Sequence, residues 1–244
     1  NKDFRNIISY VKEHDTKINI HTNGSLHNKD YWLDIGNILT SEDIINFDLD
    51  GLSDTHAIYR QNTKFENVFN NARTVISTGR PKVNWKFIVF EHNEHQIEEA
   101  RELAKINNFT NFSIIKTPRQ TFAPLKSKFT HDKLQKNLDN VEKKIHCIWN
   151  KLNKWYVSPD GLVFRCCYTG SHYYDEDNSN FYFMKDYEKN FNAFNVPIEK
   201  IISYDYWKKL DNFLEGYERS FSLCKSRCGK IGSVNEKIQE SLKS

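Results

Sequence analysis

The sequence predicts an α/β protein: parallel strands that form a partial (β/α) barrel or a small open sheet, followed by a small α+β domain. In the first 120 residues, short apolar strands alternate with amphipathic helices, which favours a parallel sheet with right-handed crossovers. Pro118 and Pro124 interrupt this pattern, and all five cysteines lie beyond them. We therefore expect two domains, residues 1–120 and residues 121–244.

Apolar periodicity places the elements of the first domain. Strands are expected where β-branched and aromatic residues gather between turn signals, at residues 18–24, 44–51, 83–90 and 112–117. Helices are expected where apolar residues recur every three or four positions, at residues 4–11, 29–39, 65–77 and 92–108. In the last helix, Asn93 is the expected N-cap and Gln96 its partner in a capping box.

The second domain has more mixed signals. The turn sequence Pro-Asp-Gly at residues 159–161 predicts a β-hairpin over residues 154–168. The remaining expectations are a linker at residues 118–131, helices at residues 132–144 and 206–216, and a final charged helix after Cys228.

Composition excludes several classes of function. The chain has 244 residues, with 35 basic and 32 acidic side chains, so its charge gives no argument for nucleic-acid binding. No apolar run approaches the length of a membrane span, and no targeting signal is visible. Reduced cysteines then point to a cytoplasmic protein.

The cysteines carry the strongest chemical signal. They form the pattern Cys147-x13-Gly-x4-Cys166, with Cys167 adjacent, followed by Cys224-x3-Cys228. Thiolates are soft ligands, and four of them in a tetrahedron select zinc or an iron–sulfur cluster. Zinc sites usually take close pairs of ligands, and only one close pair is present. We therefore interpret Cys147, Cys166, Cys224 and Cys228 as ligands of a 4Fe–4S cluster.

Three other interpretations of the cysteines remain open. They are a structural zinc site, buried small side chains, and disulfides. Disulfides fit poorly, because the number of cysteines is odd and the chain shows no secretion signal. Cys167 is left out of the ligand set because successive side chains on a strand point in opposite directions.

Several short motifs, in their order along the chain, resemble the radical SAM proteins that carry a C-terminal SPASM or twitch domain. The cysteine pattern around the hairpin resembles the signature of that domain. Four segments resemble strands three to six of the radical SAM core: HTNGSL (21–26), FDLDGLSDTHAIYR (47–60), FIVFEHNEHQIEEARELA (87–104) and FSIIKTPR (112–119). The resemblance implies that residues 1–120 end such a core and that residues 121–244 hold an auxiliary cluster.

One departure from the family is large. The Cys-x3-Cys-x2-Cys loop and the Gly-Gly-Glu segment of the core do not occur in this sequence. The simplest interpretation is a piece of a longer protein, with that loop roughly 50 to 90 residues upstream of Asn1, because two βα units are lacking. The resemblance then implies S-adenosylmethionine as cofactor and a second 4Fe–4S cluster upstream. The chain alone is expected to be inactive.

Polar residues at the carboxyl ends of the expected strands are the candidate cofactor contacts, because ligands of parallel sheets bind there. They are Thr22, Asn23, Asp48, Asp50 and Lys116. Arg60, in the helix expected after the strand at 44–51, is added because it could bind a carboxylate with two hydrogen bonds. Leu49, next to Asp48, is expected to face the helices. Ordinary turns also explain Thr-Asn-Gly at 22–24 and Asp-Gly at 50–51. A metal site at His92, His95 and Glu98 or Glu99 is a further alternative, although a helix start explains these residues better.

Two classes of function follow. The first is a radical SAM enzyme that forms a 5′-deoxyadenosyl radical and abstracts hydrogen from a peptide or small molecule. Such an enzyme needs an electron donor such as flavodoxin or ferredoxin. The second is a noncatalytic binding or scaffold protein with a structural four-cysteine site for zinc or iron–sulfur.

Overall fold

A computed structural model describes residues 3–116, 147–174, 188–215, 224 and 237–241. The chain divides into two compact units. The first contains the described residues up to 116 together with 237–241, and the second contains those between 147 and 224. The expected linker at 118–131, the expected helix at 132–144 and Cys228 lie outside the described residues.

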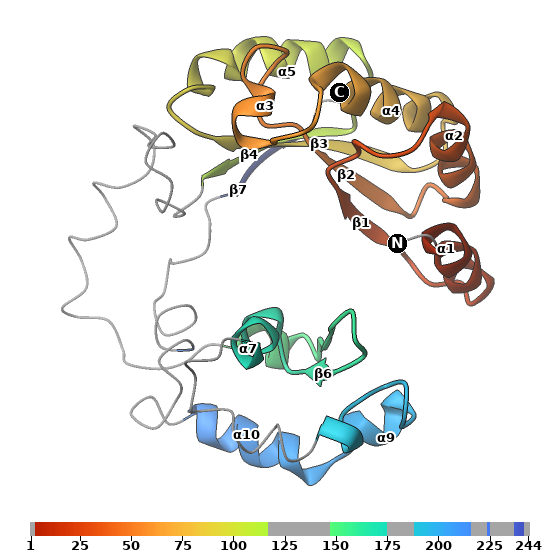
Figure 1. Ribbon diagram of the computed structural model, residues 1–244, viewed down its shortest axis with the longest axis vertical. Helices are drawn as coiled ribbons and strands as arrows, with labels where there is room; N and C mark the ends of the chain where they lie inside the picture. The colour runs from red at the N-terminus through yellow and green to blue at the C-terminus, as the bar shows by residue number, and fades with distance from the viewer. Residues whose placement is uncertain (1–2, 117–146, 175–187, 216–223, 225–236, 242–244) are drawn as a thin grey trace, which may run out of the picture. The chain divides into compact units, whose positions relative to one another are not determined.

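The first unit is built on a mixed sheet of strand order β1-β2-β3-β4-β7 (Figure 1). The first four strands are parallel: β1 (Asn19–Thr22), β2 (Ile44–Asp48), β3 (Lys82–Val89) and β4 (Asn111–Lys116). The helices are α1 (Phe4–Glu13), α2 (Lys29–Ile38), α3 (His56–Tyr59), α4 (Phe65–Ser77), η1 (Glu94–Gln96) and α5 (Ile97–Ile106). The alternation expected from the sequence, and with it the partial β/α fold, is confirmed.

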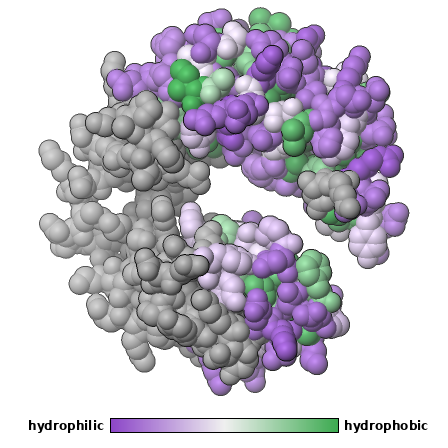
Figure 2. All heavy atoms as spheres, viewed as in Figure 1, coloured by the Kyte–Doolittle hydropathy of each residue, from purple (hydrophilic) through white to green (hydrophobic). Residues whose placement is uncertain are grey.

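One face of the sheet packs against helices. Figure 1 shows α2, α4 and α5 on the same side of the strands. The side chains that point to them are fully buried. Among them are Phe47 of β2, Leu49 just after β2, and Trp85 and Phe87 of β3. Leu49 was expected on this side, and it is part of the core. Outside this core the first unit is largely hydrophilic, as Figure 2 shows for one face.

The other face of the sheet is polar. Four asparagines, one from each parallel strand, form a chain of side-chain hydrogen bonds across it. Asn46 Nδ2 donates to Asn19 Oδ1 at 2.7 Å, and Asn84 Nδ2 donates to Asn46 Oδ1 at 3.1 Å. Asn111 Nδ2 donates to Asn84 Oδ1 at 3.0 Å. The buried amides of Asn46 and Asn84 thereby have hydrogen-bond partners.

The second unit begins with α6 (Ile148–Lys151) and a hairpin of β5 (Tyr156–Val157) and β6 (Val163–Phe164). The hairpin turns where expected, since Gly161 has a φ of 88° and its N–H donates to Ser158 O at 2.9 Å. The elements that follow are α7 (Cys167–Tyr173), η3 (Glu188–Asn190), α9 (Ile198–Ile202) and α10 (Asp205–Glu215). Phe164, Phe191 and Trp207 fill a small core of their own.

Three local expectations were wrong. The hairpin strand ends at Phe164, and Cys167 begins a helix, so strand alternation cannot separate Cys166 from Cys167. In the charged segment near the C-terminus, the described residues form a strand where a helix was expected: β7 (Lys237–Ser241) pairs antiparallel with β4 in the first unit. Pairing at a sheet edge is a nonlocal interaction that outweighs local propensity.

The capping box is the third error. Neither Asn93 nor Gln96 makes a side-chain capping hydrogen bond to the helix that follows it. Both side chains are buried and bind a loop some forty residues earlier in the sequence.

Candidate cofactor-binding site

Four charged side chains meet where β2 ends. Asp48 closes that strand, and Lys86 is its neighbour on β3 by register. Arg60 Nη2 lies 3.2 Å from Asp48 Oδ2, and Lys86 Nζ lies 3.3 Å from Asp48 Oδ1. Arg60 Nε also donates to Asp50 Oδ2 at 2.6 Å. The sequence predicted Asp48, Asp50 and Arg60 at one site, and the structure brings them together.

Asp50 has a different role from Asp48. Its side chain is fully buried, and both its oxygens are used internally: Oδ2 by Arg60 and Oδ1 by the N–H of Ile88 at 2.6 Å. Burial raises the pKa of Asp50 to about 6, although Arg60 and the Ile88 N–H favour the charged form. Asp50 therefore ties the loop to β3 and orients Arg60, and it presents no free oxygen to a ligand.

Buried side chains hold the loop that carries Asp50. Asn93 Nδ2 donates to Asp50 O at 3.1 Å, and Trp85 Nε1 donates to Leu49 O at 2.8 Å. Gln96 Oε1 accepts from the N–H of Leu52 at 3.0 Å. These contacts satisfy the backbone of an irregular buried segment, which would otherwise be costly. Local sequence patterns gave no signal for them.

Gly51 is required at the turn that follows Asp50. Its φ is 123°, a backbone conformation that other residues rarely adopt. A Cβ atom there would lie 2.1 Å from Thr55 Oγ1. The Asp-Gly pair is therefore a turn, and the same turn buries Asp50.

The groups left open at this cluster belong to Asp48 and Arg60. Asp48 Oδ1 is buried and has no hydrogen-bond partner. Within the described residues, neither terminal nitrogen of Arg60 makes a hydrogen bond of good geometry, and its side chain is 20% exposed. Lys86 Nζ lies 3.4 Å from His21 Nδ1 at the margin of the same cluster. A ligand with a hydroxyl or ammonium donor and a carboxylate acceptor would complete both residues.

Thr22 and Asn23 form the turn after β1. Thr22 Oγ1 accepts from the N–H of Gly24 at 3.0 Å, and Asn23 Oδ1 accepts from the N–H of Ser25 at 3.3 Å. Gly24 has a φ of 62°, and a Cβ there would lie 2.5 Å from a ring atom of Phe47. Both side chains therefore serve the turn, in agreement with the simpler interpretation. Lys116 is the last residue of β4, as expected.

Three of the four predicted cluster ligands lie in the second unit. Cys166 is buried, Cys147 and Cys224 are half-buried, and none of the three is in a disulfide. Cys166 Sγ accepts from the N–H of Thr169 at 3.4 Å at the start of α7. Among the residues that the structure describes, no three His, Cys, Asp or Glu side chains are grouped closely enough to hold a metal ion. Because Cys228 lies outside them, the four-cysteine set stays a prediction.

The alternative metal site around His92 and His95 is not assembled among the described residues either. His92 stacks on Phe90 with ring centroids 5.4 Å apart, and neither ring nitrogen has a hydrogen-bond partner. Burial and the neighbouring His95 lower the pKa of His92, so the ring is neutral near pH 7.

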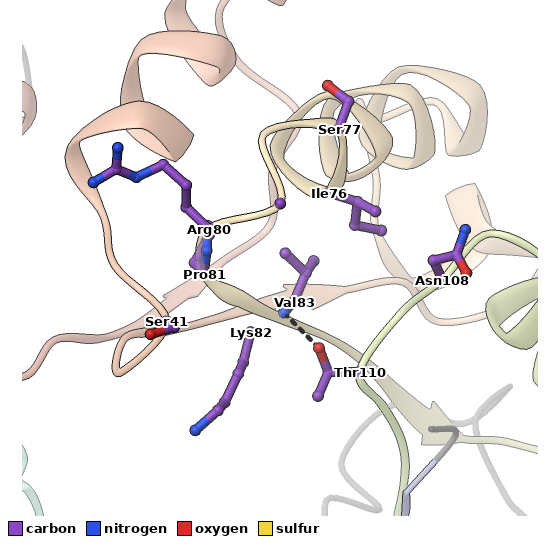
Figure 3. A pocket seen from close by; sticks show the side chains of 10 residues that line it. Ser41, Ile76, Ser77, Arg80, Pro81, Lys82, Val83, Asn108 and Thr110 are labelled. Atoms are coloured by element: carbon purple, nitrogen blue, oxygen red, sulfur yellow. Dashed lines mark hydrogen bonds between the residues drawn. The ribbon is translucent and has the colours of Figure 1, made fainter. Parts of the chain in front are cut away.

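A pocket of about 550 Å³ lies at the opposite end of the strands (Figure 3). It is lined by residues at the start of β3 and before β4, including Lys82 and Thr110. Thr110 Oγ1 accepts from the N–H of Val83 at 3.2 Å, and Arg80 Nε donates to Leu39 O at 2.9 Å. These two polar groups therefore serve the fold, and none of the predicted site residues lines the pocket.

Among the described helices, none combines the length and the apolar character needed to cross a bilayer. No protein-family model matches the sequence, and no curated protein matches it significantly.

Solved structures do match. SuiB of Streptococcus suis bound to S-adenosylmethionine superposes with a TM-score of 0.57 at 16% identity, over 93% of this chain and 56% of SuiB. Another SuiB structure gives a TM-score of 0.56 at 17% identity, over 93% and 57%. SuiB bound to the precursor peptide SuiA gives 0.43 at 19% identity, over 52% and 28%, which is too low to support an argument.

This chain therefore spans a little over half the length of SuiB. SuiB is a radical SAM protein, and the similarity extends over both units of this chain. At this level of identity the similarity shows the fold alone. The chain has the partial β/α fold of the radical SAM proteins.

Proposed function

We propose that this chain belongs to a radical SAM enzyme, in which residues 1–120 supply strands three to six of the core and residues 121–244 an auxiliary iron–sulfur domain. The strand β7 departs from this division, because it pairs with β4 in the sheet of the first unit. The observation that carries the proposal is the open Asp48–Arg60 cluster at the carboxyl ends of parallel strands, where such sheets bind their ligands. The likeness to SuiB over both units supports it.

S-adenosylmethionine has the groups that this cluster lacks. Its ribose carries two hydroxyl donors, and its methionyl end carries an ammonium group and a carboxylate. We assign Asp48 Oδ1 as the acceptor for a hydroxyl or ammonium group, since within the described residues that oxygen makes no hydrogen bond and has only Lys86 Nζ, 3.3 Å away, as an ion-pair partner. We assign the terminal nitrogens of Arg60 as donors to the carboxylate, because a guanidinium can bind it with two parallel hydrogen bonds.

Asp50 would orient Arg60, and Lys86 would help to balance the charge of Asp48. Asp50 holds Arg60 Nε and so fixes the plane of the guanidinium. Lys86 and Arg60 together balance the two carboxylates in the ligand-free protein. When bound, S-adenosylmethionine and a reduced 4Fe–4S cluster would supply a 5′-deoxyadenosyl radical for hydrogen abstraction from a peptide or small molecule.

The second unit would hold an auxiliary 4Fe–4S cluster on Cys147, Cys166, Cys224 and Cys228. The three described cysteines lie within one unit and form no disulfide, which supports this assignment. An external electron donor such as flavodoxin or ferredoxin would reduce the enzyme.

The test uses the protein from the complete coding sequence, purified and reconstituted without oxygen. We expect S-adenosylmethionine to bind in calorimetry and 5′-deoxyadenosine to form when a reductant is added. The conservative variant Asp48→Asn should weaken binding at least tenfold, whereas Asp34→Asn, on the exposed surface of α2, should bind as the wild type does. A complete protein that binds no S-adenosylmethionine would favour the scaffold alternative.

A further inference from the structure

His56 connects Asp50 to Arg60 in the charged cluster, although nothing in the sequence singled it out. It is 1% exposed and begins α3, between Asp50 and Arg60 in the sequence. Its Nδ1 lies 3.3 Å from the backbone N of Asp50, and its Nε2 lies 3.0 Å from Thr63 Oγ1. Thr63 Oγ1 in turn lies 2.6 Å from the carbonyl oxygen of Arg60.

These contacts fix the tautomer of the ring. The backbone N–H of Asp50 can only donate, so Nδ1 must accept and carries no proton. The carbonyl of Arg60 can only accept, so the Thr63 hydroxyl donates its hydrogen there. Nε2 must then donate to Thr63 Oγ1 and carries the proton of a neutral imidazole.

The ring thus joins the backbones of Asp50 and Arg60, which are ten residues apart. The same two residues are joined through their side chains at 2.6 Å. Loss of the ring would leave the Asp50 N–H without an acceptor. It would also remove the hydrogen bond from Nε2 to Thr63 Oγ1 that helps to hold the turn after Arg60. The guanidinium would then lose its fixed direction, while the sheet and its core would remain.

We propose that His56 is a positioning residue: its neutral ring fixes the Asp50–Arg60 pair so that the terminal nitrogens of Arg60 are aimed at the carboxylate of the ligand. The proposal rests on the proposed function for the identity of that ligand, S-adenosylmethionine. It does not depend on that function for the geometry of Arg60, and the two parts are tested separately.

The first test needs no ligand. In the complete protein labelled with 15N-arginine, the Nε–H of Arg60 should give a separate NMR signal with slow solvent exchange, because it is bonded to buried Asp50. His56→Leu should abolish the slow exchange. His56→Asn should retain it, since its side-chain oxygen can replace Nδ1 as the acceptor for Asp50. An unchanged Arg60 signal in His56→Leu would overturn the proposal.

The second test compares two ligands in calorimetry, S-adenosylmethionine and 5′-methylthioadenosine, which lacks the amino-acid end. His56→Leu should lose about tenfold or more in affinity for S-adenosylmethionine and little for methylthioadenosine, and His56→Asn should recover most of the loss. The exposed His95 provides a matched control, His95→Leu. Equal losses for both ligands would mean general damage and would overturn the proposal. A wild-type protein that binds neither ligand would refute the proposed function, while the NMR result would still decide the role of His56.

Discussion

Arg60 and Asp50 form an ion pair of 2.6 Å in which the carboxylate has no exposed surface. Taking two charges out of water is costly, and the pair offsets this only while both members are present. Burial raises the pKa of Asp50, and the charges of Asp50 and Asp48 raise the pKa of Arg60 despite its own burial. The pair therefore makes the cluster sensitive to the loss of either residue.

Arg60→Met should destabilise the protein by roughly 3–5 kcal/mol, because it leaves a buried carboxylate without its counterion. Urea unfolding at pH 7 measures this, with Arg73→Met as control, since Arg73 is exposed on α4. The double variant with Asp50→Asn should regain part of the loss, because the buried charge is then absent. If Arg60→Met costs no more than the control, the pair does not stabilise the fold.

The pH dependence of stability should report His56. Burial, followed by the charge of Arg60, lowers the pKa of His56 to about 4, while Glu66 acts weakly the other way. In the unfolded chain this histidine takes up its proton near its ordinary pKa of about 6.5. Its contribution to folding is therefore complete above pH 6.5 and is lost as the pH falls from there to about 4.

Asp50 acts in the opposite direction. Its pKa is raised to about 6, so its contribution to stability is lost as the pH rises from about 4 to 6. The two residues partly cancel in the wild type, and only a comparison with a variant isolates His56. We expect the stability difference between the wild type and His56→Asn to be largest at pH 7 and to shrink towards pH 4.5. Urea unfolding at several pH values tests this, and a difference independent of pH would contradict it.

Local periodicity explains why much of the fold could be predicted. The helix at Phe65–Ser77 and the strands of the parallel sheet follow from apolar spacing that any buried helix or strand must show. The position of Asp48 at the end of a parallel strand could also be predicted, and its role in ligand binding stays a prediction.

Nonlocal hydrogen bonds explain what could not be predicted. Asn93 and Gln96 have the spacing of a capping box, yet their amides bind the loop after β2 because that loop is buried and needs partners. His56 is a single histidine in a polar segment and has no pattern to mark it. The strand β7 exists because it pairs with the edge of β4, which its own residues do not reveal.

The cysteine assignment predicts metal content. Complete, reconstituted protein should contain iron and sulfide for an auxiliary cluster in the second unit, and alanine variants of Cys147, Cys166, Cys224 or Cys228 should each lose about four iron atoms per chain. Zinc without sulfide at these positions would contradict the assignment.

Cys167→Ala separates the two adjacent thiols. Cys167 begins α7, and burial, followed by the neighbouring Cys166, raises the pKa of its thiol, which disfavours the thiolate that a metal needs. Cys166 is buried, and its Sγ accepts a hydrogen bond from the N–H of Thr169, a contact that supports a ligating sulfur. Cys167→Ala should therefore keep its iron. A loss as large as that of Cys166→Ala would mean that the wrong member of the pair was chosen.

The last prediction compares the contributions of Asp48 and Lys86 to ligand affinity. Asp48 Oδ1 lies 3.3 Å from Lys86 Nζ but has no hydrogen bond, so a ligand donor can take that oxygen without breaking one. Asp48→Ala should weaken the binding of S-adenosylmethionine at least tenfold, because a charged acceptor contributes about 1.5–3 kcal/mol. Lys86→Met should reduce the affinity for S-adenosylmethionine much less, since Arg60 still pairs with the carboxylate of Asp48.

Calorimetry on the complete protein measures both variants, with Lys82→Met as the control from the amino-terminal end of the same strand. Asp48→Ala should also lose affinity for 5′-methylthioadenosine if its oxygen binds the ribose, and should keep it if the oxygen binds the methionyl ammonium group. A larger effect from Lys86→Met than from Asp48→Ala would mean that Lys86, and not Asp48, contacts the ligand. The Asp48 oxygen would then be a partner of Lys86 and not of the cofactor.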